Sequence, residues 1–171
     1  MKKLIVILYN IRSTYNVGAI LRTCDCLGVD EVIFTGYTPF LDKGLPHEQV
    51  KLKKQIHKTA LGAEETVNWS RNDDIYNIIE KCQADGLRVV ALEQGANSQN
   101  MAEARNYPDL ALILGEEVHG IPPEILVKCD QLYEIPMCGN KESFNVSVAT
   151  GIALWEIRKN SLNDNRNHLR Q

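Results

Sequence analysis

Short apolar runs recur along the chain, and segments with helical spacing separate them. The runs occupy residues 4–8, 31–34, 88–92, 110–114 and 131–135. Apolar runs of this length predict buried strands, and strands that alternate with helices indicate a mainly parallel sheet with helices on both faces. The sequence therefore predicts an α/β fold.

Three helices are predicted from apolar spacing and from end signals. In the segment 16–27 the apolar residues recur at helical spacing, with Asn16 as the expected N-cap and Gly28 as the stop. The segment 73–85 predicts a second helix, and Pro122-Pro123 is expected to open a short third one.

The last predicted helix, about residues 145–160, is apolar on more than one face. Its apolar residues are Val146, Val148, Ala149, Ile152, Ala153, Trp155 and Ile157. A helix that is apolar most of the way round is buried. It is either an internal core helix of a monomer, or a helix that lies on the sheet and is covered by a second subunit.

Two segments are expected to lack regular structure. Residues 35–55 are predicted to form a long loop, and loops of that length in compact domains tend to be functional. The polar residues 163–171 are expected to be disordered. We therefore expect one domain over residues 1–160, followed by a polar tail over residues 161–171.

Composition is that of an ordinary soluble enzyme. The 171 residues fit one domain, and no apolar run approaches the ~20 residues that a membrane-spanning helix needs. Lys2 and Lys3 lead into an apolar stretch that is too short for a signal peptide and lacks a small-residue cleavage site. We therefore expect a cytoplasmic protein without a membrane contact.

The cysteines predict neither a metal site nor a redox centre. Their number is odd, and their spacing matches no zinc finger and no redox dithiol: Cys24, Cys26, Cys82, Cys129 and Cys138. Reduced, mostly packed thiols are the expected state.

The net charge of −3 does not favour contact with nucleic acid over the whole surface, because phosphate contacts need local positive charge. Basic residues gather in two places. One group is Lys51, Lys53, Lys54, His57 and Lys58, and the other is Arg158, Lys159, Arg166 and Arg170. Such groups are either RNA contacts or solvated faces.

Several common catalytic motifs are absent from the sequence. It contains no Gly-x-Gly-x-x-Gly, no Gly-Lys-Ser/Thr phosphate loop, no His-Glu-x-x-His and no nucleophile elbow. The candidate chemistry instead lies in three separate blocks.

The first block runs from Asn16 to Thr23. On a helical net Arg22 shares a face with the small residues Gly18, Ala19 and Cys26, which allow a partner helix or a ligand to approach closely. The planar guanidinium of Arg22 suits a phosphate. The alternative is a surface arginine on a routinely capped helix.

The second block, Gly115 to Gly120, follows the strand predicted at residues 110–114. Ligands of parallel sheets bind at the carboxyl ends of strands, so this turn is a candidate site that Glu117 would face. Turns in which glycine and an acid follow a strand are also common without any ligand.

The third block, residues 135–147, combines a strand end, a loop with Gly139 and a helix start. Ser143, Asn145 and Ser147 offer more capping side chains than one helix start uses, which indicates a ligand. A capped turn is the alternative for any one of them.

Together the three blocks resemble the signature motifs of the SpoU (TrmH-like) family of SPOUT RNA 2′-O-ribose methyltransferases, in order and spacing, over about residues 4–158. The resembling residues are Asn16, Arg22 and Thr23, then Leu114-Gly115-x-Glu117-x-x-Gly120, then Ile135-Pro136-Met137-x-Gly139 and Ser143 to Ser147. Phe144 departs from the leucine usual in the family, and we expect this to change packing only.

The resemblance implies a homodimer that packs through its first and last helices, and a C-terminal deep trefoil knot, which is one of the rare exceptions to unknotted topology. It also implies that the knot binds S-adenosylmethionine. The implied cofactor contacts are Leu92, Glu93, Leu114, Gly115, Glu116, Gly120, Ile135, Met137, Ser143 and Asn145.

The resemblance also implies the reaction, which is methylation of a ribose 2′-hydroxyl in tRNA or rRNA, and the catalytic residues. Arg22 corresponds to the position that activates the hydroxyl. Arginine is a poor base, so we expect it to hold the adjacent phosphate and stabilise the developing alkoxide. Asn16 would order Arg22 or the substrate, Glu117 would accept hydrogen bonds, and Ser143 with Asn145 would fix ribose or cofactor.

The RNA is expected to contact Arg12, Lys51, Lys53, Lys54 and Lys58. The first predicted strand begins within the first few residues, so no extra N-terminal RNA-binding domain is expected, which favours a tRNA substrate. Residues 58–64, however, resemble a segment common to tRNA and rRNA members. A catalytically inactive RNA-binding or nucleotide-binding protein of the same fold is the alternative function.

Overall fold

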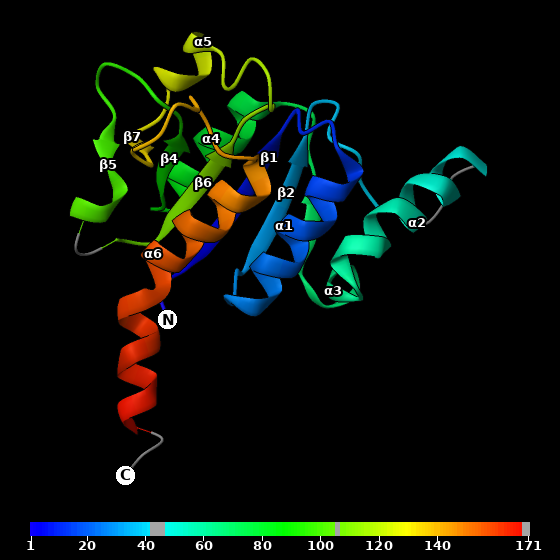
Figure 1. The fold of residues 1–171 in the computed structure, drawn as a ribbon, viewed down its shortest axis with the longest axis horizontal. Helices are drawn as coiled ribbons and strands as arrows, with labels where there is room; N and C mark the ends of the chain where they lie inside the picture. Colours follow the sequence, from blue (N-terminus) through cyan, green and yellow to red (C-terminus); the bar gives the residue numbers. More distant parts are fainter. Residues whose placement is uncertain (42–46, 105–106, 169–171) are drawn as a thin grey trace.

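The computed structural model describes residues 1–41, 47–104 and 107–168, and these contain one seven-stranded sheet (Figure 1). The strand order is β3-β2-β1-β6-β4-β7-β5, and all six neighbouring pairs are parallel. The strands are β1 (Leu4–Tyr9), β2 (Glu31–Thr35), β3 (Trp69–Arg71), β4 (Arg88–Leu92), β5 (Gln99–Asn100), β6 (Leu110–Leu114) and β7 (Gln131–Glu134). The predicted α/β class is confirmed. The short β3 and β5 were not predicted, because so few residues carry no readable pattern.

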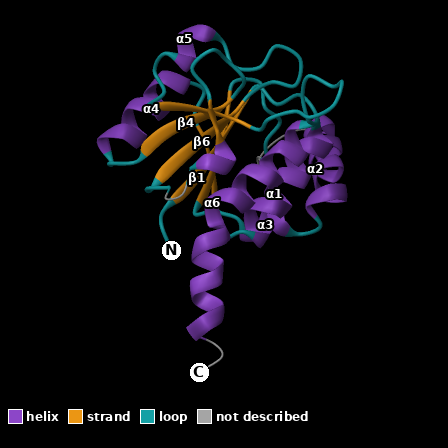
Figure 2. Ribbon diagram, turned by 60° about the vertical axis from the view of Figure 1, so that its left-hand side comes forward, coloured by secondary structure: helices purple, strands orange, loops and turns teal. Residues whose placement is uncertain are grey.

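Helices cover both faces of the sheet (Figure 2). They are α1 (Thr14–Cys26), α2 (His47–Ala60), α3 (Ala63–Thr66), α4 (Ile75–Ala84), α5 (Pro123–Leu126) and α6 (Val146–His168), with a 3-10 turn at Met101–Glu103. Strand side chains point alternately to opposite faces. Leu4, Val6 and Leu8 of β1 therefore join the core beneath α1 and α6. Ile5 and Ile7 join a second core beneath α4 and α5.

The four predicted helices are present, but the predicted N-cap of α1 was wrong. Ser13 caps the helix, since its Oγ accepts a 3.3 Å hydrogen bond from the backbone N–H of Asn16. Asn16 lies inside the first turn, and its side chain bonds to distant parts of the chain instead. The helix ends before Gly28, as expected.

The predicted loop over residues 35–55 was wrong in its second part, where α2 begins at His47; residues 42–46 lie outside the described residues. Helix α2 is mostly polar and buries few apolar side chains, so its periodicity is weak. It packs on α1 at Gly18, where a Cβ would lie 2.2 Å from the Ile56 carbonyl oxygen. This close approach of two helices accounts for the small residue at position 18.

Helix α6 continues to His168, although the polar composition predicted a disordered tail from residue 163. Its last turns extend beyond the sheet (Figure 1). The sequence after residue 160 has neither glycine nor proline, so it contains no strong stop signal for a helix that has already formed. Residues 169–171 lie outside the described residues, and the domain boundary at residue 160 stays a prediction.

Arg158 does not belong to a basic surface, although the sequence places it in one group with Lys159, Arg166 and Arg170. Only 2% of the residue is exposed, and its guanidinium donates to the carbonyl oxygens of Lys2 at 2.5 Å and Gly28 at 2.7 Å. The side chain thereby fixes α6 to the start of β1 and to the end of α1. Sequence grouping missed this because burial of an arginine depends on tertiary acceptors.

Candidate functional site

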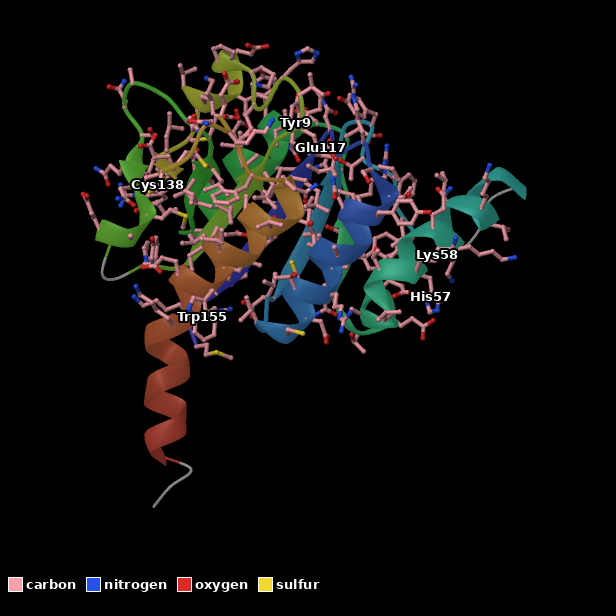
Figure 3. The ribbon with its side chains drawn as sticks, in the orientation of Figure 1. Tyr9, His57, Lys58, Glu117, Cys138 and Trp155 are labelled. Carbon is pink, nitrogen blue, oxygen red and sulfur yellow. The ribbon has the colours of Figure 1, made fainter. Side chains whose placement is uncertain are left out.

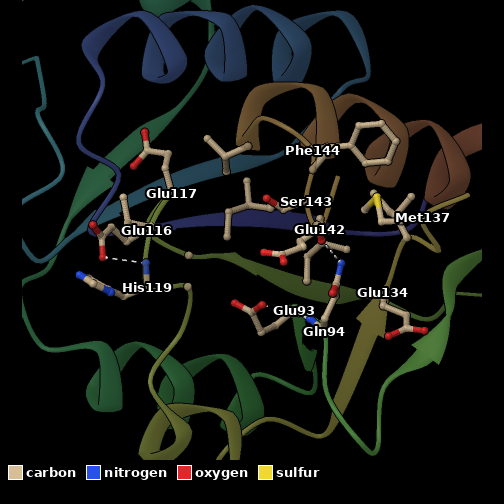
Figure 4. Close-up of a pocket in the computed structure, with 18 residues that line it drawn as sticks. Glu93, Gln94, Glu116, Glu117, His119, Glu134, Met137, Glu142, Ser143 and Phe144 are labelled. Atoms are coloured by element: carbon tan, nitrogen blue, oxygen red, sulfur yellow. Dashed lines mark hydrogen bonds between the residues drawn. The ribbon is translucent and has the colours of Figure 1, made fainter. Parts of the chain in front are cut away.

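Strands β4, β6 and β7 end at one cavity of about 330 Å³ (Figure 4). A cavity at the carboxyl ends of parallel strands is the usual position for a ligand, and this volume suits a small molecule. Of the ten predicted cofactor contacts, nine line it: Leu92, Glu93, Leu114, Gly115, Glu116, Gly120, Ile135, Met137 and Ser143. Asn145 does not, because it sits at the start of α6 with its side chain directed to α1.

The turn after β6 is held tightly against the end of β4. Gly120 has a φ of +66°, and a Cβ there would lie 2.3 Å from Oε2 of Glu93. That same oxygen accepts a 2.9 Å hydrogen bond from the backbone N–H of Ile121. At Gly115 a Cβ would lie 2.8 Å from the Gly120 carbonyl carbon. Glycine is therefore required at both positions, because a side chain at either one would change the shape of the cavity.

The cavity wall is rich in acid. Five glutamates contribute to the lining, and none of the described lining residues is a lysine or an arginine: Glu93, Glu116, Glu117, Glu134 and Glu142. Figure 4 shows their side chains arranged around the cavity. A site with this excess of negative charge suits a ligand that carries positive charge.

Residues from the three sequence blocks meet in one hydrogen-bond chain beside the cavity. Oε1 of Glu117 accepts a 2.9 Å hydrogen bond from Nδ2 of Asn16. Oδ1 of Asn16 accepts a 3.2 Å bond from Nδ2 of Asn145, and Oδ1 of Asn145 accepts from the backbone N–H of Ser147 at 2.9 Å. The chain thus connects the turn after β6, helix α1 and the start of α6.

Glu117 is an acceptor held by several donors. Besides Asn16, the backbone N–H groups of Arg12 and Ser13 donate to its carboxylate at 3.0 and 3.3 Å. Burial raises the pKa of Glu117, but the hydrogen bonds from Arg12, Asn16 and Ser13 outweigh burial, and the net shift of the pKa is downward. Glu117 is therefore a carboxylate at neutral pH.

Arg12 lies at the edge of the cavity. Its Nε is 2.8 Å from Oε1 of Glu116. Glu116 is buried, with only 7% of the residue exposed. This ion pair holds the buried Glu116 carboxylate in the cavity wall and fixes Arg12 at the edge of the cavity.

The five predicted catalytic residues lie in three different places. Glu117 and Ser143 line the cavity. Asn16 and Asn145 stand behind Glu117 in the hydrogen-bond chain. Arg22 is exposed on α1, does not line the cavity, and makes no ion pair with any described residue. A role for Arg22 therefore requires a ligand or a second molecule to reach it.

The predicted RNA-contacting lysines lie together on α2. All four are exposed: Lys51, Lys53, Lys54 and Lys58. Figure 3 labels Lys58 on α2 and Glu117 on the far side of α1 from it. The basic face and the cavity are thus separate features of the molecule.

Three polar residues of the cavity were missed by sequence reasoning. Glu134 is the last residue of β7, Glu142 lies in the loop before α6, and His119 lies in the turn after β6. For Glu134 the signal was its place at the carboxyl end of a predicted strand. Glu142 and His119 had no signal beyond their nearness to predicted contacts.

Two further features are absent from the described residues. They contain no group of three or more His, Cys, Asp or Glu side chains that could hold a metal ion. None of their helices has the combination of length and apolar character that crossing a membrane requires.

Comparison with known sequences gives a family match. The model of the SpoU rRNA Methylase family matches residues 3–155. A tRNA (guanosine(18)-2′-O)-methyltransferase of Aquifex aeolicus is 32% identical over 92% of this chain and 70% of its own length. A 23S rRNA (guanosine-2′-O-)-methyltransferase of Vibrio vulnificus is 33% identical over 93% of this chain, which spans 60% of that relative.

Solved structures agree with the sequence match. An S-adenosylmethionine-bound rRNA methyltransferase of Sinorhizobium meliloti superimposes with a TM-score of 0.80 at 27% identity, over 92% of this chain and 56% of that one. The TrmH/SpoU tRNA-modifying enzyme of A. aeolicus gives a TM-score of 0.77 at 29% identity, over 94% and 78%. The chain therefore belongs to the SpoU methylase family.

Proposed function

We propose that this protein is an S-adenosylmethionine-dependent methyltransferase that methylates a ribose 2′-hydroxyl of tRNA or rRNA. The observation that carries the proposal is the acid-lined cavity after β4, β6 and β7, joined to the chain of Glu117, Asn16 and Asn145. The substrates named for the Aquifex and Vibrio relatives support RNA as the acceptor.

The cavity fits this cofactor on its own chemistry. S-adenosylmethionine carries a sulfonium, an ammonium and a carboxylate group, and the surplus of glutamates complements its net positive charge. Gly115 and Gly120 let backbone approach the ligand closely. The residues expected to hold it are those of the three strand ends together with Ser143.

When bound, the cofactor supplies a sulfonium methyl group for direct displacement, which needs no metal. The residues of the chain position the acceptor. Glu117 fixes Asn16 and Asn145 through their side-chain amides, so that the edge of the cavity is rigid where the ribose enters. Arg22 holds a phosphate of the RNA and stabilises negative charge on the attacking 2′-oxygen as the hydroxyl proton passes to solvent water.

Arg22 requires a second subunit in this proposal. Helices α1 and α6 contact each other where Gly151 faces Thr23. Beside this contact, α6 exposes an apolar stripe of Val148, Ile152 and Trp155, and the exposed Phe144 lies in the loop just before the helix. We propose that two copies dimerise through α1 and α6, which covers the stripe and brings Arg22 of one copy to the cavity of the other.

The knotted topology and the cellular location are also part of the proposal. Residues 135–145 connect β7 to α6, and several of them line the cavity at the strand ends, which fits a C-terminal segment threaded into a deep trefoil knot. The five free thiols fit a reducing compartment, and we propose the cytoplasm.

Nucleoside mass spectrometry of tRNA and rRNA from cells that lack the gene tests the function. One 2′-O-methylated nucleoside is expected to be missing and to return when the gene is restored. If every 2′-O-methyl nucleoside persists, the methyltransferase function is wrong, and the alternative of a non-catalytic RNA-binding protein is favoured.

A further inference from the structure

An exposed tyrosine stands next to Arg12 at the rim of the cavity. Tyr37 is 52% exposed, and its ring centroid lies 5.9 Å from Cζ of Arg12, within the range of a cation–π contact. Nε of Arg12 is in turn 2.8 Å from the cavity residue Glu116. The aromatic face is therefore one side chain away from the cavity wall.

The backbone that carries Tyr37 is fixed on several sides. Its N–H donates a 3.1 Å hydrogen bond to Oδ1 of Asn10, which has a φ of +57° at the end of β1. The carbonyl oxygen of Gly36 accepts a 3.1 Å bond from the guanidinium of Arg71. A Cβ on Gly36 would lie 1.9 Å from Asn10 Oδ1, so only glycine allows this contact.

Thr38 fixes the other side of Tyr37. Thr38 is 1% exposed, and its hydroxyl donates to the Leu8 carbonyl at 2.8 Å and accepts from the Ile11 N–H at 3.0 Å. The turn after β2 is thus bonded to the turn after β1. The backbone that carries the exposed ring of Tyr37 is therefore fixed on both sides.

An exposed aromatic ring on a well-bonded turn, beside an exposed guanidinium, has the chemistry that binds unpaired nucleotides. Bases of single-stranded RNA stack on tyrosine rings and on guanidinium planes, whereas bases within a duplex are not free to do so. The 58% exposed side chain of Arg12 also offers donors to a phosphate. The neighbouring Tyr37 side chain and, to a smaller extent, the Glu116 carboxylate raise the pKa of Arg12, so its guanidinium is charged at neutral pH.

We infer that Tyr37 and Arg12 form a stacking platform for an unpaired RNA base beside the nucleotide that is methylated. The inference rests on the proposed function for the identity of the neighbouring nucleotide, and it adds a substrate class. The enzyme acts on a single-stranded loop or bulge, because the base next to the target must leave its stack to reach the ring.

Variants at residue 37 separate stacking from apolar contact and from misfolding. Tyr37→Phe keeps the ring, Tyr37→Leu keeps apolar bulk without an aromatic face, and Tyr37→Ala removes both. The full chain is titrated with a fluorescein-labelled single-stranded RNA of mixed sequence and with the same RNA annealed to its complement. Urea unfolding and calorimetry with S-adenosylmethionine establish that each variant folds and keeps its cofactor site.

Tyr37→Ala and Tyr37→Leu are expected to weaken single-stranded RNA binding at least about five-fold, while Tyr37→Phe stays within about two-fold of wild type. Cofactor affinity should be equal in all four proteins. The duplex should bind more weakly and respond little to the substitutions. Unchanged single-stranded binding in Tyr37→Ala, or an equal loss in Tyr37→Phe, would overturn the platform.

The test of the platform and the test of methyl transfer can be told apart by their results. A wild-type chain that binds single-stranded RNA through Tyr37 but transfers no methyl group overturns the methyltransferase proposal and keeps the platform. A chain that methylates RNA equally well with alanine at residue 37 keeps the methyltransferase proposal and overturns the platform.

Discussion

Oδ1 of Asn16 accepts a 3.2 Å hydrogen bond from Nδ2 of Asn145, a residue 129 positions later in the chain. The direction of this bond is set at both ends. The Glu117 carboxylate can only accept hydrogen bonds, so Asn16 must direct its Nδ2 to Glu117. The backbone N–H of Ser147 can only donate, so Asn145 must direct its Oδ1 to Ser147. Both amides are therefore locked in one orientation.

Replacing Asn16 tests this lock. Asn16→Ala removes a hydrogen bond to a charged group and is expected to lower the free energy of unfolding by about 1.5–3 kcal/mol. Asn16→Asp should cost more at pH 7, because it sets a second carboxylate against Glu117. Urea unfolding measures both, and Asn68→Ala is the matched control, since its exposed amide bonds only to the Asp30 carbonyl. Equal stability of Asn16→Asp and wild type would contradict the lock.

The depressed pKa of Glu117 predicts a pH dependence of stability. A carboxyl group with a lowered pKa in the folded state stabilises the fold above its unfolded pKa of about 4.3, and the stabilisation is lost as pH falls through the folded pKa. The wild type should therefore exceed Glu117→Gln in urea midpoint at pH 7, and the difference should shrink below about pH 4.5. The other titrating groups, including Glu64, are present in both proteins, so their contributions cancel in the difference between the two urea midpoints. A difference that grows as pH falls would refute the assignment.

Gly115 should not tolerate a side chain. A Cβ there would meet Ile121 Cγ1 at 2.5 Å and the Gly120 backbone at 2.8 Å, and overpacking of this kind costs about 1–3 kcal/mol. Gly115→Ala is expected to lose stability and to bind S-adenosylmethionine more weakly, as measured by urea unfolding and calorimetry. Gly139→Ala is the control in the same region, because a Cβ at Gly139 has no neighbour within 4 Å. Normal cofactor affinity in Gly115→Ala would mean that the turn does not shape the site.

The sheet was predictable because apolar runs mark buried strands, as at Leu110–Leu114, where every residue is buried. Helix α2 was not, since Ile56 and Ala60 are the only buried residues over its positions 50–60, and so sparse a pattern does not predict a helix. The cavity residues after β6 and β7 were predictable from the second and third blocks, whereas Leu92 and Glu93 at the end of β4 followed only from the family resemblance. The connections between the three blocks were not predictable, because a capping rule sees only neighbours of Asn16 in sequence, whereas Glu117 and Asn145 reach it through the fold. Tyr37 had no local signal, since its exposure and its contact with Arg12 are tertiary properties.

The apolar stripe on α6 predicts the oligomeric state. Trp155 is 53% exposed, and Figure 3 shows it at the outer side of α6. Light scattering of the wild type should give the mass of a dimer, and Trp155→Glu should give a monomer without methyltransferase activity, because a buried charge opposes association. Val127→Glu is the matched control, at a 77% exposed residue that directly follows α5 on the other face of the sheet. A fully active wild-type monomer would contradict the proposed dimer.

Transfer of a deuterated methyl group tests the central claim most directly. The purified chain is incubated with S-adenosylmethionine labelled in its methyl group and with RNA from cells that lack the gene, and the nucleosides are analysed by mass spectrometry. The wild type is predicted to place the label on a ribose 2′-oxygen. Arg22→Ala should bind the cofactor normally, since Arg22 does not line the cavity of its own subunit and is proposed to contact the RNA, but it should transfer the label about 100-fold more slowly. Label on a base, no label from a wild type that binds the cofactor, or undiminished transfer by Arg22→Ala would contradict the account.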